Sequence, residues 1–175
     1  MISYVNLTAK LLGVELGMPS MIAANKLTFA KISNKVSAEY SEARKELPSS
    51  GSERKIVLMD SISLVTNQDR EKIIVSGSHG GMLGKDPNTA LKYDAFAGFF
   101  HDAGVGKANA GITGLEPLNE RGIIAGTVDG MSARIGDGVS VYNDGVISHL
   151  NKVAETAGGK IGLPLKKFIE KLVKL

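Results

Sequence analysis

Four short apolar runs constrain the fold of this chain more than any other feature. Each is built mainly from Ile, Val, Leu, Phe and Ala; they span residues 56–59, 73–75, 95–100 and 122–128. A strand with one face in water alternates apolar and polar residues, whereas a strand covered on both faces is apolar throughout. We therefore expect these runs to be strands in the interior of a sheet.

Helical patterns separate and follow these strands, at residues 86–93, 113–121, 146–157 and 164–173. The segment 60–72 fits either a short helix or, at 62–65, a further strand. Strands that alternate with helices predict right-handed crossovers and a parallel sheet. The predicted fold class is therefore α/β: a three-layer, mostly parallel, doubly wound sheet of at least four strands, forming a ligand-binding domain over residues 51–175.

Residues 1–50 differ in character and are predicted to form an N-terminal helical arm or hairpin. From Pro19 to Leu47, apolar side chains recur at helical spacing, which predicts one amphipathic helix. A shorter segment containing Leu7 and Leu11 has the same spacing. The apolar stripe fits packing against the sheet or contact with a second subunit, and the second alternative predicts a homo-oligomer.

The composition is typical of a soluble domain and argues against nucleic-acid-binding, disulfide-bonded and membrane proteins. Of the 175 residues, 43% are hydrophobic and 22% charged, as in an ordinary soluble domain. The net charge of +3 comes without the dense basic stripe of a nucleic-acid-binding surface. The chain has no cysteine, which excludes disulfides and thiolate metal ligands. With no signal-peptide pattern and no run of about 18 apolar residues, we expect a cytoplasmic protein that binds neither nucleic acid nor membrane.

Polar, glycine-rich loops follow three of the apolar runs, at residues 76–81, 101–107 and 129–138. The carboxyl ends of parallel strands meet at one edge of a sheet, which is where open α/β sheets bind ligands. We therefore expect the three loops to form a single rim around a ligand.

The nucleotide-binding motifs known from other proteins are incomplete in these loops. The segment 104–107 reads Gly-Val-Gly-Lys, but His101 and Ala108 stand where a P-loop requires glycine and a hydroxyl residue. The dinucleotide fingerprint is incomplete as well, and the chain has no His-Glu-x-x-His zinc motif. A divalent metal is the one cofactor that remains to be considered.

The predicted site combines groups from the three loops and from the end of the first strand. Candidates for catalysis are His79, His101, Asp102 and Asp137. Candidates for substrate binding are Asp60, Ser61, Gly77, Ser78, Gly80, Gly81, Lys107, Ser132 and Arg134.

Several of these residues have two possible roles. The glycines of 77–84 could let successive backbone N–H groups surround an anion, or they could form a tight turn without a ligand. Lys107 fits an anion contact or a solvated side chain. Arg134 fits an anion contact or a salt bridge to Asp102 or Asp60.

Three functions use this set of residues. The first is an enzyme that performs acid–base chemistry on a small anionic metabolite, a carboxylate or a phosphate, with lyase, isomerase and hydrolase left open. The second is a metal-dependent hydrolase whose divalent ion is held by His79, His101 and some of Asp60, Asp102 and Asp137. The third is a protein that binds a small ligand in a regulatory role without turning it over. The sequence favours them in that order.

Overall fold

The computed structural model describes residues 1–31, 41–48, 54–84 and 86–175, and it divides into two compact units, Met1–Tyr40 and Ser41–Leu175. The larger unit contains one six-stranded sheet with strand order β1-β2-β3-β4-β5-β6. The strands are β1 (Arg44–Glu46), β2 (Ile56–Met59), β3 (Ile73–His79), β4 (Ala97–His101), β5 (Ile124–Val128) and β6 (Ile147–Leu150). Strands β2 to β5 are parallel, whereas β1 and β6 are antiparallel edges. The predicted α/β class with a mostly parallel sheet is confirmed.

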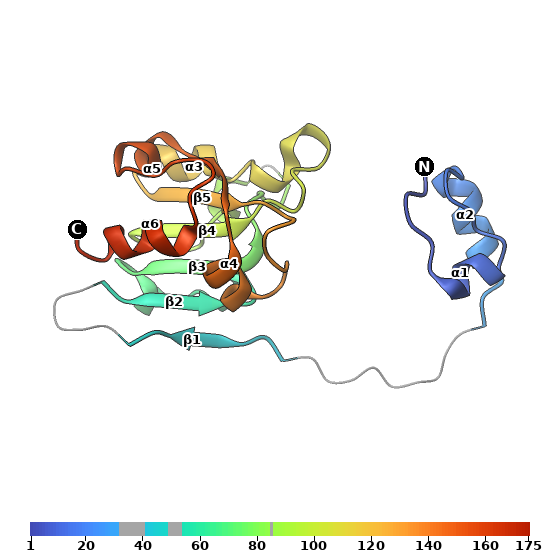
Figure 1. Ribbon diagram of the computed structural model, residues 1–175, viewed down its shortest axis with the longest axis horizontal. Coiled ribbons are helices and arrows are strands. Elements are labelled where there is room, and N and C mark those ends of the chain that lie inside the picture. The colour runs from blue at the N-terminus through green and yellow to red at the C-terminus, as the bar shows by residue number, and fades with distance from the viewer. Residues whose placement is uncertain (32–40, 49–53, 85) are drawn as a thin grey trace. The chain divides into compact units, whose positions relative to one another are not determined.

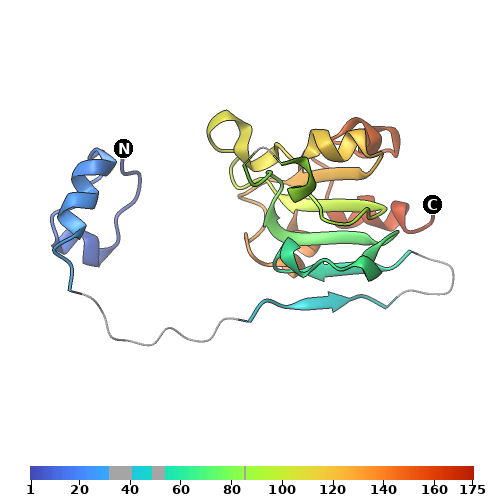
Figure 2. The ribbon, with the colours of Figure 1, turned by 180° about the vertical axis from the view of Figure 1, so that it is seen from behind.

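Both faces of the central strands β2 to β5 are covered, which is why the runs 56–59, 73–75 and 97–100 carry no charged or polar side chain. On one face lie α4 (Gly138–Asp144), α5 (Lys152–Thr156) and α6 (Leu165–Leu172), of which α4 and α6 stand in front of the strands in Figure 1. Helix α3 (Leu115–Glu120) and the connections that follow β2 and β3 cover the other face, seen in Figure 2. Each layer buries its own apolar cluster against the sheet.

The connections on that second face are short 3₁₀ helices. They are η1 (Ile62–Leu64), η2 (Asn67–Asp69), η3 (Pro87–Thr89) and η4 (Lys107–Ile112). Segment 60–72 thus takes the helical alternative. The helix predicted over 86–93 is only one turn long, because the chain leaves it at Ala90 and Leu91 to bury both side chains under the sheet.

The C-terminal part of the larger unit differs from the prediction of one helix over 146–157. Residues 147–150 form strand β6, and α5 begins only after Asn151. The Asn151 side chain caps α5 at Ala154 and also accepts the backbone N–H of Ala125 in β5. The apolar residues of this segment are therefore divided between strand β6 and helix α5. Helix α4, which the sequence analysis assigned to no element, begins at the Asp137 cap.

The N-terminal unit contains α1 (Leu7–Leu11) and α2 (Ser20–Leu27). The predicted helix from Pro19 to Leu47 is wrong at its C-terminal end, and its central part, 32–40, lies outside the described residues. Residues 44–46 form β1 instead, because their charged side chains pair with groups beside β2 and β3. The end of the predicted arm thus belongs to the sheet. None of the described helices is both long and apolar enough to cross a membrane.

Candidate functional site

The three glycine-rich segments lie at the carboxyl ends of β3, β4 and β5, so they do share one edge of the sheet, but residues 76–79 are the last part of β3 and not a loop. The loop after β5 crosses this edge and is bonded to it, with Gly136 N–H donating to Gly77 O at 2.8 Å. From the other face, Gly114 N–H donates to Gly80 O at 2.9 Å. A Cβ atom on Gly77 would lie 2.3 Å from the Asp137 nitrogen. Much of the predicted rim is therefore filled by the protein's own backbone.

The backbone after β3 forms a tight turn and not an anion nest. Its amides at residues 80–83 donate to internal acceptors: Gly80 to His101 O, Gly81 to His79 Nδ1, Met82 to Thr113 Oγ1 and Leu83 to Thr89 Oγ1. A Cβ on Gly81 would lie 1.8 Å from Ala110 O. The glycines are required for close approach of two backbone segments. The amides of residues 80–83 are therefore not available to an anion.

His101 and Asp102 are buried and hold loops in place. The Ala103 N–H donates to His101 Nδ1 at 2.9 Å, and His101 Nε2 donates to Ala133 O at 3.0 Å. Both ring nitrogens are thus used. Asp102 accepts the Gly104 N–H at 2.8 Å. The two residues line a hollow of about 510 Å³, but their bonded atoms stabilise the loops around it.

The loop after Asp102 is strained. Residues 103–106 all have positive φ, from 52° at Ala103 to 71° at Gly106, and the β-branched Val105 has a φ of 63°. This left-handed conformation costs about 1–2 kcal/mol for each residue with a Cβ. Hydrogen bonds from Val105 N–H to Asp102 O and from Gly111 N–H to Val105 O hold it. Lys107 follows in η4 with an exposed side chain.

Asp60 lies at the end of β2 and bridges two segments. One carboxylate oxygen accepts the Ala43 N–H at 2.8 Å, next to β1, and the other accepts the Gly138 N–H at 3.2 Å, at the start of α4. This explains its place at a strand end without any ligand. Ser132 has a similar role, since its hydroxyl accepts the Val146 N–H at 3.0 Å.

Asp137 and Arg134 form an ion pair at the start of α4. The Arg134 guanidinium donates to Asp137 at 2.8 Å, and Asp137 also accepts the Ser140 N–H. The Ser140 N–H and then the Arg134 charge hold the pKa of Asp137 below its ordinary value. The expected salt bridge of Arg134 thus exists, but its partner is neither Asp102 nor Asp60.

His79, Ser61, Ser78 and Gly81 come together in a different place, a pocket of about 430 Å³ at the carboxyl ends of β2 and β3. Sequence reasoning missed much of its lining: apolar Ile62, Val65, Leu83 and Ala90, and polar Ser63, Asn88, Thr89 and Lys92. Most of these lie in or beside 3₁₀ turns, whose side chains follow no clear period. A largely apolar wall with a few convergent polar groups is typical of small-molecule sites.

His79 presents a hydrogen-bond donor to this pocket. The Gly81 N–H donates to its Nδ1 at 3.1 Å, so that the neutral ring carries its proton on Nε2. Within the described part of the chain, Nε2 has no hydrogen-bond partner, and the side chain is exposed. Apart from His79, Lys92 is the one ionisable residue among the described lining residues. The pocket therefore suits a ligand with negative charge.

A chain of hydroxyls leads from the pocket to a carboxylate. The hydroxyls of Ser61 and Ser63 lie 2.8 Å apart, and Ser63 donates to Glu42 Oε2 at 3.4 Å. Because Ser63 uses its proton for Glu42, Ser61 donates to Ser63. A proton accepted by Ser61 can be passed along this chain to Glu42.

The predicted metal ligands do not form one cluster, although His79 and His101 are register partners on β3 and β4. His79 and His101 line different hollows, and Asp60 and Asp137 are bonded to backbone amides. Among the described residues, no group of three or more His, Cys, Asp or Glu side chains could hold a metal ion. No family model, no curated protein and no solved structure matches the chain. A function for this chain therefore has to be inferred from the chemistry and geometry of its own residues.

Proposed function

We propose that this chain is an enzyme that binds a small carboxylate or phosphate in the pocket beside His79 and moves a proton on it. One observation carries the proposal: the Nε2–H of His79 is an unused donor in a pocket whose other ionisable lining residue is Lys92. The first of the three functions considered from the sequence is thus retained, with a smaller set of residues. Asp60, His101, Asp102, Ser132 and Asp137 instead bond the backbone of the surrounding loops.

The proposed chemistry divides between two sides of the pocket. His79, held by Gly81, donates from Nε2 to a substrate oxygen on which negative charge develops, as preorganised donors do in other enzymes. Ser61 accepts the proton that the substrate loses while its own proton moves to Ser63 and that of Ser63 to Glu42; the reverse transfer along the same chain returns a proton to another atom of the substrate and restores the Glu42 carboxylate. Lys92 neutralises the anionic group. The apolar wall contacts the uncharged part of the substrate.

Binding is tested with two matched lysine variants. We expect Lys92→Met to weaken binding of inorganic phosphate or of small carboxylates by about tenfold, since an anion loses a charged contact worth about 1.5 kcal/mol or more. Lys107→Met removes another exposed lysine, one of the predicted rim that does not line the pocket, and should leave binding unchanged. Isothermal titration of both variants gives the comparison. Stronger loss with Lys107→Met would refute this location.

Turnover is tested separately from binding. With a panel of small carboxylates and phosphate esters, we expect Glu42→Gln to abolish product formation and to leave ligand affinity within a factor of about two, because Glu42 acts only through the hydroxyls. His79→Ala should reduce both. Ligand binding without product from the wild-type protein across the panel would reject the enzyme and leave a binding protein.

A further inference from the structure

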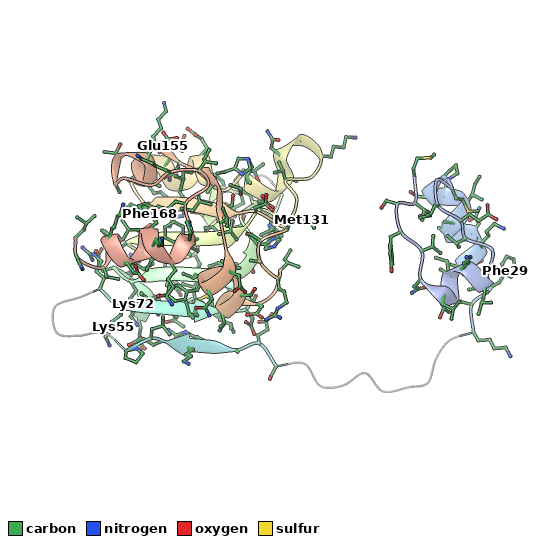
Figure 3. All side chains as sticks on the ribbon, viewed as in Figure 1. Phe29, Lys55, Lys72, Met131, Glu155 and Phe168 are labelled. Atoms are coloured by element: carbon green, nitrogen blue, oxygen red, sulfur yellow. The ribbon has the colours of Figure 1, made fainter. Side chains whose placement is uncertain are left out.

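The N-terminal unit is too poorly buried to be stable alone. Among its described residues only Val14 and Ala23 are buried, whereas nine large apolar side chains are exposed. These are Met1, Tyr4, Leu7, Leu11, Leu16, Met21, Ile22, Leu27 and Phe29. Figure 3 shows this unit with its side chains and labels Phe29, which is 83% exposed.

Units below about 40 residues need a disulfide, a metal or association with another chain to be stable. The chain has no cysteine, and the described residues contain no group that could hold a metal. Local hydrogen bonds do give the unit a defined shape. Asn6 caps α1 at Ala9, and the strand-like start is tied to the loop before α2 by Ile2 N–H to Met18 O at 2.8 Å. A defined shape with an unburied apolar surface is typical of a protein-binding face.

A hollow of about 320 Å³ in this surface carries two opposite charges. Tyr4, Val5, Val14 and Leu16 form its apolar lining, and Lys10 and Glu15 are its charged residues. Neither Lys10 nor Glu15 belongs to any ion pair found in the described part of the chain. The hollow therefore offers one positive and one negative group to whatever covers it.

We infer that the partner is a second copy of the same unit, related by a two-fold axis that places Lys10 of each copy opposite Glu15 of the other. A two-fold interface brings the same patch of both copies together, so the patch must be complementary to itself. A surface with one lysine, one glutamate and apolar surroundings meets this condition. An anionic membrane would favour a uniformly basic face, which Glu15 interrupts.

The pairing is tested by exchanging charges in the full-length protein. Lys10→Glu and Glu15→Lys each place like charges opposite one another twice in a dimer, and each should weaken the dimer by about tenfold or more. An equimolar mixture of the two variants restores both pairs and should dimerise like the wild type. Lys26→Glu is the matched control, because Lys26 also lies in the last turn of its helix but does not line the hollow.

Sedimentation velocity over a concentration series measures these equilibria. A wild-type monomer at all concentrations would overturn the inference, whether the unit then bound anionic vesicles, another protein or the rest of its own chain. Dimers that tolerate both single variants, or that fail to form from the mixture, would overturn it as well. None of these results depends on the ligand pocket.

Discussion

Replacing Asp69 with alanine is expected to lower the free energy of unfolding by about 3–5 kcal/mol, the usual cost of removing one partner of a buried ion pair. The Asp69 side chain is fully buried and forms ion pairs with Arg44 and Lys72. It also accepts hydrogen bonds from the backbone N–H and the hydroxyl of Thr66. The alanine variant leaves Arg44 and Lys72 without this charge. Figure 3 labels Lys72 and, nearby, Lys55, which both also bind Glu46 in β1.

The structural consequence should centre on β1. This strand has three exposed residues, so its attachment depends on its ion pairs and on its hydrogen bonds with β2. Urea unfolding gives the energy, and hydrogen exchange at residues 44–47 reports release of the strand. Asp94→Ala is the control, because Asp94 is 59% exposed in its pair with Arg121 and should cost no more than about 1 kcal/mol. Equal losses in the two variants would contradict the account.

Asp69 and Glu46, with their cationic partners, also determine how the free energy of unfolding responds to acid. Burial by itself would raise the pKa of Asp69, but hydrogen bonds from Thr66 and the Arg44 charge hold it below its usual value. Hydrogen bonds from Lys55 and then Lys72 lower the pKa of Glu46 to about 2. Because both are depressed below the unfolded value of about 4, their stabilisation is complete above about pH 5 and is lost as the pH falls toward 2. We expect the urea midpoint to fall between pH 7 and about pH 3, and to fall less in Asp69→Ala. A decline of the same size in that variant would assign the acid response to other groups.

Replacing Phe168 with alanine is the second change of large effect, with an expected loss of about 3–5 kcal/mol from the cavity that it creates. Phe168 is fully buried on α6, and its ring meets Phe99 of β4 edge-on, with centroids 5.7 Å apart and planes at 74°. It joins the last helix to the centre of the sheet. We expect the variant to unfold at lower urea concentration with the loss concentrated in α6.

Phe29→Ala is the matched control for Phe168→Ala. It removes the same side chain from a position that is 83% exposed, labelled together with Phe168 in Figure 3. An exposed substitution of this kind changes stability by no more than about 0.5 kcal/mol. A comparable loss in the two variants, measured by urea unfolding below the dimer concentration range, would show that Phe168 is not a central contact.

The interior strands could be predicted from the sequence because burial on both faces leaves a short run without charged residues, as at 73–75 and 97–100. Strand β1 could not, since its three charged residues carry no apolar pattern and are held by partners distant in sequence. The prediction of one helix over residues 146–157 was wrong for the opposite reason. Their apolar spacing satisfies a helix, while Asn151 divides them into a strand and a short helix through side-chain bonds that no local pattern records.

The candidate site, too, could be predicted from the sequence only in part. The position of the rim follows from strand direction, and His79 was found because it ends a strand. His101 has the same place on the next strand, and the two are register partners. Only the hydrogen bonds distinguish them, because His101 uses both ring nitrogens and His79 uses one. Lys92 follows a 3₁₀ turn and carried no sequence signal.

The central claim is that His79 offers its Nε2–H to an anion in the pocket. The chain has only three histidines, so nitrogen-15 NMR of the imidazole rings resolves each of them directly. We expect the neutral ring of His79 to carry its proton on Nε2 and this signal to shift on titration with inorganic phosphate or small carboxylates, while the His101 ring stays unchanged. A His79 proton on Nδ1, or anion-dependent shifts at His101 with none at His79, would contradict the account.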